Sequence, residues 1–385
     1  MFQKIFIRSA FVYLLLILAI ALTATESTKE LKAEEKTTAE KPDVDLVICL
    51  DCSGSMSGLI NLAREKIWEM INEFAKAKPH PNLRVALYNF GGNAAPENGH
   101  VIQMTNLTVD LDKVYEKLFA LKTNGGTELV GRVLHESLEK LNWSKQPNAL
   151  KIIFVAGNES ANQDKTYNYL EMAGKAIESG TIVNAFYCGN PGDNIAPEWE
   201  QIAKRADGSY HAINQNDRIM AQLGAAPQDE NLRKLNGRIN STYLPFGEGG
   251  AKAKEAQIAQ DNNAKTQSKN AYAQRACSKA NGMYRNSLWD LVDAMKEEKF
   301  DLEKIKDEEL PEEMQKMTLV ERKAHIQKKT EERTQIQKEI LQLSKDRQEW
   351  VKQELKRLGK EDTFGKILTK MIREQAKTKN FEFEE

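Results

Sequence analysis

The sequence LVICLDCSGSM, residues 46–56, passes from an apolar run into a loop that is rich in hydroxyl groups. Its first five residues suit a buried parallel strand that is covered on both faces. Asp51 stands where that strand should end, and ligands of open α/β sheets gather at the carboxyl ends of strands. Ser53 and Ser55 follow two residues apart, so an extended loop points both hydroxyls to one side. A carboxylate and two hydroxyls can therefore converge on one point.

Oxygen donors at this spacing suit a hard cation such as Mg²⁺ better than Zn²⁺. A short Asp/Ser/Gly stretch is also typical of a turn ahead of a helix, so the spacing alone leaves a purely structural role open. The Asp-x-Ser-x-Ser pattern of residues 51–55 resembles the metal-ion-dependent adhesion site (MIDAS) of von Willebrand factor type A (VWA) domains.

Strand and helix patterns alternate downstream of this stretch. We predict strands over residues 83–90, 101–107, 150–155, 181–188 and 209–213, and helices over residues 59–78, 111–121, 129–141, 167–179 and 197–206. The turn that begins at Gly91 suits a hairpin at the edge of the sheet. The alternation predicts an α/β fold, with a doubly wound, mostly parallel sheet and helices on both faces. The VWA resemblance implies the same fold for residues 44–223.

The resemblance also implies which residues form the second loop of the metal site. In the stretch TNGGTE, residues 123–128, Thr127 matches the Thr that the family places before an amphipathic helix. Thr127 is also a suitable N-cap for the helix predicted over residues 129–141, and the two roles are compatible.

The third loop departs from the family pattern, which places an Asp in Thr-Asp-Gly after the fourth strand. This chain has VAGNES at residues 155–160, and alignment on the Gly puts Ala156 at the position of that Asp. Asn158 is a nearer substitute ligand than Glu159. We expect Mg²⁺, held weakly because a carboxylate is missing, at the following residues: Asp51, Ser53, Ser55, Thr127 and Asn158.

The resemblance implies that such a site binds a partner protein, whose acidic residue completes the coordination of the cation. The alternative is a scaffold protein whose metal site is vestigial and whose helical carboxyl-terminal half makes the contacts. An enzyme is not expected, because the five His residues are scattered and lack the spacing of a metalloprotease. A nucleic-acid partner is not expected either, because the net charge is −1 and Lys and Arg alternate with Asp and Glu.

The amino-terminal end predicts export. Lys4 and Arg8 precede an apolar run over residues 10–22, which is typical of a secretory signal peptide over residues 1–24. An uncleaved membrane anchor is the alternative, and it would be the chain's only contact with a membrane. Residues 25–43 are polar and suit a flexible linker. We therefore expect a periplasmic or secreted protein.

Export permits disulfides. The Cys-x-x-Cys at residues 49–52 could suggest redox chemistry, but Cys49 lies within the predicted strand. Two small buried side chains therefore explain this motif better than a redox site does.

The composition changes after residue 223, and residues 224–385 are predicted to form a charged helical region. Helical patterns cover residues 231–240 and 251–274. Thr318 and Glu321 form a capping box that opens a long helix near residues 318–358, with Gly359 at its end. Its apolar spacing is incomplete for a coiled coil, so local packing is favoured over a dimeric coiled coil.

Overall fold

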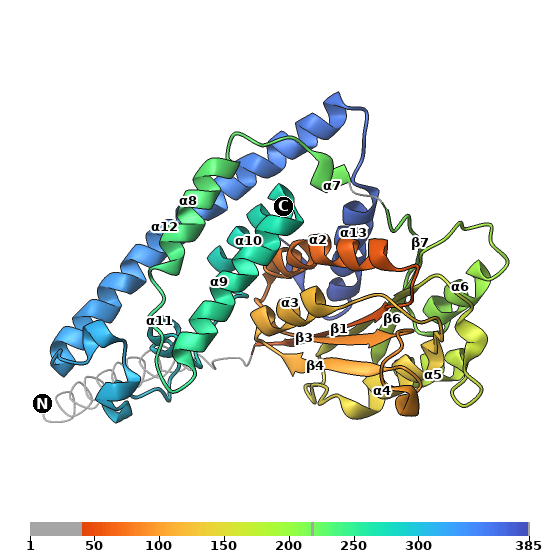
Figure 1. Cartoon of the computed structure of the whole chain (residues 1–385), viewed down its shortest axis with the longest axis horizontal. Helices are drawn as coiled ribbons and strands as arrows, with labels where there is room; N and C mark the ends of the chain where they lie inside the picture. The colour runs from red at the N-terminus through yellow and green to blue at the C-terminus, as the bar shows by residue number, and fades with distance from the viewer. Residues whose placement is uncertain (1–40, 217–218, 384–385) are drawn as a thin grey trace, which may run out of the picture. The chain divides into compact units, whose positions relative to one another are not determined.

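The structure is a computed structural model that describes residues 41–216 and 219–383. Residues 43–212 contain a six-stranded sheet (Figure 1). In their order across the sheet the strands are β4 (Ile102–Thr108), β3 (Asn82–Phe90), β1 (Asp43–Asp51), β5 (Leu150–Gly157), β6 (Thr181–Tyr187) and β7 (Tyr210–Ala212). Neighbouring strands are parallel except for β3 and β4. This is the mostly parallel α/β sheet predicted from the sequence, with the expected antiparallel edge.

The central strand β1 pairs with β3 on one side and with β5 on the other. Its side chains alternate between two cores: Leu46, Ile48 and Leu50 pack on one face of the sheet, and Val47 and Cys49 pack on the other. Helices cover both faces, which is why the strand is an unbroken apolar run. All four cysteines of the chain are buried and free, and for Cys49 and Cys52 this was predicted from the sequence.

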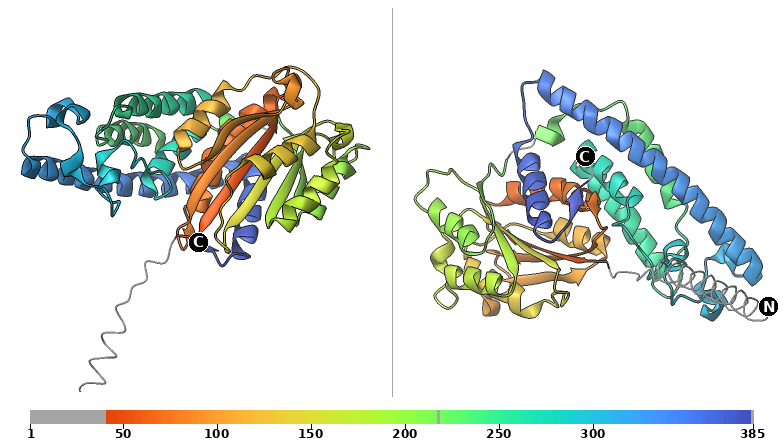
Figure 2. Two further views of the ribbon diagram at one scale, coloured as in Figure 1. Left: turned by 90° about the horizontal axis from the view of Figure 1, so that it is seen from below. Right: turned by 180° about the vertical axis from the view of Figure 1, so that it is seen from behind.

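Two layers of helices enclose the sheet (Figure 2). The helices α2 (Ser57–Phe74) and α3 (Leu111–Ala120) contribute to the core on the Leu50 face, and α4 (Val130–Lys140), α5 (Tyr169–Glu178) and α6 (Ala196–Arg205) contribute to the core on the Cys49 face. The prediction that the first helix continues to residue 78 is wrong. Ala77–Lys78 instead forms a short strand, β2, that pairs with β8 (Glu382–Phe383) near the end of the chain.

The carboxyl-terminal region is helical, as predicted. It contains α7 (Ile219–Gln222), α8 (Asp229–Asn240), α9 (Gly250–Gln267), α10 (Lys269–Ala280), α11 (Leu291–Ala294), α12 (Leu319–Arg357) and α13 (Thr363–Lys377). The Thr318 capping box opens α12, and Gly359 follows its end with a φ of 62°. The single helix predicted over residues 251–274 is two helices, because Ser268 is extended and its hydroxyl accepts from the Ala271 N–H as the N-cap of α10. The helix α13 was not predicted from the sequence.

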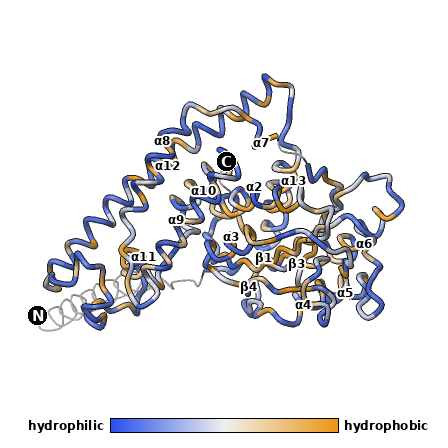
Figure 3. Tube along the Cα trace, viewed as in Figure 1, coloured by the Kyte–Doolittle hydropathy of each residue, from blue (hydrophilic) through white to orange (hydrophobic). Residues whose placement is uncertain are grey.

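The helix α12 is mostly hydrophilic (Figure 3), but one side of it is buried. Its buried Ile336 and Ile340 belong to the same core as residues of α2 and α10, so it packs locally in this chain. Polar contacts join the regions as well: the Asn72 side chain on α2 donates to the Gln274 backbone oxygen on α10 at 2.9 Å. From Pro42 onward the chain forms one compact unit.

The predicted signal peptide over residues 1–24 and most of the predicted linker lie outside the described residues. The first strand begins at Asp43, the last residue assigned to the linker. Among the residues that the structure describes, none of the helices has the length and apolar character needed to cross a membrane.

Candidate functional site

The first loop of the site leaves β1 at Asp51, whose side chain is fully buried. The Ser53 backbone N–H donates to Asp51 Oδ1 at 2.7 Å, which turns the chain sharply after the strand. The other carboxylate oxygen, Oδ2, is buried and meets no hydrogen-bond donor in the described part of the chain. A buried carboxylate oxygen with no donor is costly. Asp51 is therefore placed to accept a ligand that the chain itself does not supply.

The serine hydroxyls and Asn158 lie beside this carboxylate. The Oγ atoms of Ser53 and Ser55 are 3.5 Å apart, and the Asn158 Nδ2 donates to Ser55 Oγ at 3.1 Å. Asn158 follows β5, and its backbone N–H also favours the ionised form of Asp51. Its Oδ1 is buried and has no hydrogen-bond partner among residues 41–216 and 219–383. The first and third loops thus bring oxygen atoms of these residues close together.

The second loop docks on the first through backbone hydrogen bonds. Asn124 N–H donates to the Cys52 oxygen at 2.9 Å, and Gly54 N–H donates to the Gly125 oxygen at 3.4 Å. Thr127 forms a bridge to Gly91 at the end of β3 and is solvent-exposed. The N-cap role considered for Thr127 is wrong, because α4 begins after Leu129, and no side chain caps it. Thr127 therefore borders the site without capping the helix.

Glu128, the next residue, is a member of the site that the sequence analysis missed. Its side chain is 3% exposed, and it interacts with the side chains of Asp51 and Ser53. Burial raises the pKa of Asp51 to about 6, although the backbone and hydroxyl of Ser53 favour the ionised form. Burial, and then the charge of Asp51, raises the pKa of Glu128 to about 8. The one feature of the sequence that could have indicated this role of Glu128 is its position directly after Thr127.

The donor set fits a hard divalent cation. It consists of carboxylate, hydroxyl and amide oxygens, which suit Mg²⁺ or Mn²⁺ better than the nitrogen and sulfur ligands that Zn²⁺ prefers. No group of three or more His, Cys, Asp or Glu side chains suitable for a metal occurs in the described ranges, so hydroxyls and amides would have to complete the shell. The buried Oδ2 of Asp51 and Oδ1 of Asn158, which lack partners in the described chain, are available for this.

Residues 45–223 match the family model of the von Willebrand factor type A domain. This part of the chain is a VWA domain. No curated protein sequence matches the chain.

Solved structures similar to the chain include proximal thread matrix protein 1 from the mussel byssus, with a zinc-occupied MIDAS motif, at 12% identity and a TM-score of 0.37 over 47% of this chain and 44% of that chain. The pilus adhesin SpaC from Lactobacillus rhamnosus GG is 17% identical, with a TM-score of 0.36 over 46% of this chain and 28% of that chain. A von Willebrand factor type A structure from Catenulispora acidiphila is 17% identical, with a TM-score of 0.34 over 54% of this chain and 47% of that chain. The chain spans less than half the length of each of these three.

The structure decides where Ala156 of the VWA domain points. The register pairs Ala156 with Leu50, so its side chain faces the core on the Leu50 side of the sheet, where it is 4% exposed. It lines an apolar cavity of about 40 Å³ together with Phe186 and Leu368. Ala156 therefore belongs to the core and not to the metal loops.

Gly157 is the residue that lies beside the carboxylate of Asp51. A Cβ at this position would lie 3.2 Å from Asp51 Oδ2 and 3.0 Å from Cη2 of Trp199. The ring of Trp199 is fixed there, because its Nε1 donates to the Glu159 backbone oxygen at 2.9 Å. Neither Ala156 nor Gly157 brings an acid to the VWA domain's third loop, and Glu159 is exposed.

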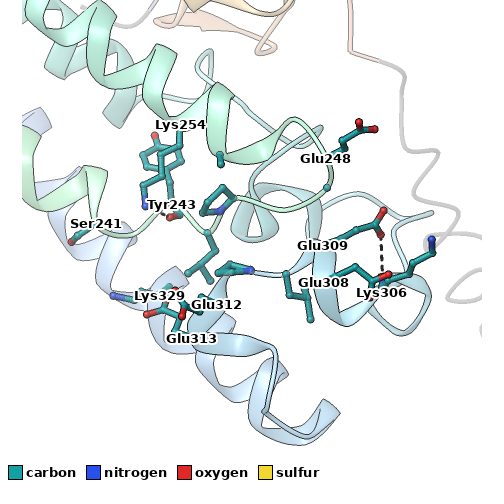
Figure 4. A pocket seen from close by; sticks show the side chains of 16 residues that line it. Ser241, Tyr243, Glu248, Lys254, Lys306, Glu308, Glu309, Glu312, Glu313 and Lys329 are labelled. Carbon is teal, nitrogen blue, oxygen red and sulfur yellow. Dashed lines mark hydrogen bonds between the residues drawn. The ribbon is translucent and has the colours of Figure 1, made fainter.

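A second candidate surface lies outside the VWA domain, in the carboxyl-terminal region (Figure 4). It is a pocket of about 1110 Å³ between the start of α9 and the segment before α12. Five glutamates and three lysines line it: Glu248, Glu308, Glu309, Glu312, Glu313, Lys254, Lys306 and Lys329. Lys254 donates to the Tyr243 backbone oxygen at 2.8 Å, and Lys306 N–H donates to Glu309 at 3.3 Å. No role was predicted for these residues from the sequence.

Proposed function

We propose that this chain is an exported, non-enzymatic protein whose VWA domain binds a partner protein through a divalent cation. The observation that supports this most is the convergence of oxygen atoms at the carboxyl end of β1. The buried Asp51 Oδ2 and Asn158 Oδ1 lack hydrogen-bond partners in the described chain, and the hydroxyls of Ser53 and Ser55 lie beside them. Buried polar atoms are normally paired, so a site with several unpaired oxygens suits a cation.

In this proposal Asp51, Ser53, Ser55, Thr127 and Asn158 hold Mg²⁺ or Mn²⁺. When bound, the cation supplies an electrophilic position that an Asp or Glu of the partner can occupy. The three loops orient the oxygen donors, and the backbone bonds of Asn124 and Gly54 keep the second loop against the first. Binding of metal and of partner should then be positively coupled.

Export is proposed from the basic residues Lys4 and Arg8 and the apolar run that follows them. The proposed location is the periplasm or the extracellular space, with retention by an uncleaved anchor as the alternative. Sequencing the amino terminus of the native protein distinguishes these: a start near Thr25 supports cleavage, and Met1 on a cytoplasmic protein contradicts export.

The metal-binding part is tested by calorimetric titration of Mg²⁺ and Mn²⁺ into the full chain and into Asp51→Ala. Wild type should give saturable heat, and Asp51→Ala should give none, because it removes the carboxylate at the centre of the site. Circular dichroism of the variant checks that it remains folded. If neither wild type nor Asp51→Ala gives heat at millimolar metal, metal-dependent binding is contradicted. It would favour the scaffold alternative, in which the helical region, including the pocket of Figure 4, makes the contacts.

A further inference from the structure

Glu128 has an unusual environment for a residue next to an exposed loop. It lies directly after Thr127, yet its side chain is 3% exposed and its Oε2 is buried without a hydrogen-bond partner in the described chain. Its backbone is held on both sides: its N–H donates to Gln163 Oε1 at 3.3 Å, and its oxygen accepts from Val130 N–H at 3.2 Å. The side chain is thus fixed in the interior by the loop geometry.

Glu128 and Asp51 converge on the space above Gly91, the residue that follows β3. Gly91 has a φ of +81°, and a Cβ there would lie 2.5 Å from Asp51 Oδ1 and 3.0 Å from Glu128 Cγ. A side chain at position 91 would therefore collide with both acids, and its backbone conformation is one that favours glycine. The absence of a side chain at Gly91 lets the two carboxyl groups share one buried space.

No cationic side chain in the described part of the chain compensates the two carboxyl groups. Neither Asp51 nor Glu128 forms an ion pair with a Lys, Arg or His among the described residues, and the groups that act on them there are Ser53, Asn158, Glu159 and each other. Two adjacent buried carboxylates without a cation are strongly unfavourable. A divalent cation between them satisfies both oxygens and both charges.

We propose that Glu128 is a second carboxylate ligand of the cation, in place of the acid that the third loop lacks at Ala156 and Gly157. This inference rests on the proposed function and adds a residue to it. A shell with Asp51 and Glu128 carries two negative charges, which neutralise a divalent cation. The site then holds the cation more tightly than a shell with Asp51 as its single acid, because ligand charge helps to set the affinity. A shell with two carboxylates also binds a divalent cation in preference to a monovalent one.

The chain offers a matched control at Glu159. This acid lies in the third loop next to Asn158, it is exposed, and its charge acts on Glu128. Glu128→Gln and Glu159→Gln each remove one acidic group near the site, but only Glu128→Gln removes a buried carboxyl group beside Asp51. A long-range charge effect would lower the metal affinity of both variants alike. A ligand role of Glu128 would lower the metal affinity of Glu128→Gln alone.

The test is calorimetric titration of Mn²⁺ into the full chain as wild type, Glu128→Gln, Glu159→Gln and Asp51→Ala. Glu128→Gln should weaken Mn²⁺ binding about 10- to 100-fold, the range typical of losing a supporting interaction at a metal site. Glu159→Gln should weaken it less than about threefold. Wild-type affinity in Glu128→Gln, or equal losses in the two Gln variants, would overturn the role of Glu128 and leave the proposed function intact. No Mn²⁺ heat in wild type would overturn both.

Thermal unfolding in chelator shows whether Glu128→Gln still folds. The variant keeps the shape of the side chain and is uncharged, as Glu128 itself mostly is at pH 7 with a pKa of about 8, so its melting temperature at pH 7 should equal or exceed that of wild type. Added Mn²⁺ should then raise the melting temperature of wild type more than that of Glu128→Gln. An equal rise in both proteins would contradict the proposal by a measurement that is independent of the calorimetry.

Discussion

The Nζ of Lys66 lies 2.6 Å from the Oδ2 of Asp362, a residue 296 positions further along the chain. Lys66 is on α2, the helix that begins directly after the first loop of the site. Asp362 is the N-cap of α13, and its Oδ1 accepts from the Gly365 N–H at 3.0 Å. Lys66 also contacts Glu69 at 2.8 Å. The pair therefore ties the helix that leaves the metal loops to a helix near the carboxyl end.

Replacing Lys66 should destabilise the whole chain. Burial alone would lower the pKa of Lys66, but the charges of Glu69 and Asp362 raise it above its ordinary value, so the ammonium stays charged. Lys66→Met leaves the two carboxylates without their cation, and we expect a loss of about 3–5 kcal/mol in the free energy of unfolding. Urea unfolding measures it. Lys117→Met, which removes an exposed pair with Glu116, is the control and should cost less than about 1 kcal/mol. Equal losses would contradict the prediction.

A fragment of residues 41–225, which contains the VWA domain, tests how far the domain depends on the helical region. The core on the Leu50 side includes Ile239, Ile340 and Ile372, which the fragment lacks. Asp112 of α3 would also lose the Arg275 guanidinium, which lies 2.6 Å away in the full chain. We expect the fragment to unfold with lower cooperativity and stability than the full chain, measured by circular dichroism in urea. A sharp transition at the same urea concentration would show that the domain is independent.

An acid at position 156 should destabilise the protein and leave metal affinity unchanged. The side chain of Ala156 faces an apolar cavity between the sheet and α13, so Ala156→Asp buries a carboxyl group there; the cavity's charged lining residue, Lys66, is already paired with Glu69 and Asp362. The expected cost is several kcal/mol in the free energy of unfolding. Ala156→Ser is the control for a small polar group and should cost less. Tighter Mn²⁺ binding by Ala156→Asp would show that this side chain reaches the metal loops after all.

The buried Lys279 predicts a pH dependence of stability. Burial lowers the pKa of Lys279 to about 8, although Asp261, 2.9 Å away, opposes this. Between pH 8 and the ordinary lysine value of 10.5 the unfolded chain binds more protons than the folded chain, so stability rises with pH. The unfolding free energy of wild type relative to Lys279→Met should rise by up to about 1.4 kcal/mol per pH unit in this window. The difference in unfolding free energy between wild type and Lys279→Met should be constant below pH 8. A fall in this difference between pH 8 and 10 would contradict a lowered pKa of Lys279.

The sequence by itself determined the sheet and the first loop of the site. The apolar run of residues 46–50, the alternation of strands and helices, and the Asp51, Ser53 and Ser55 spacing depend on local patterns, and the strands and loops lie where those patterns put them. The capping box at Thr318 is equally local and correctly marks the start of α12. These features need only the periodicity of a strand or helix and the chemistry of a cap.

Only the tertiary structure decided the rest. Alignment on a glycine could not tell that Ala156 faces the core, because the direction of a side chain at a strand end depends on the register with β1. Glu128 directly precedes the helix predicted over residues 129–141, and only the docking of its loop on Asp51 and Gly91 buries it. Residues 77–78, which were predicted to be helical, pair instead with strand β8 near the end of the chain. Such contacts join distant parts of the chain, and no local pattern encodes them.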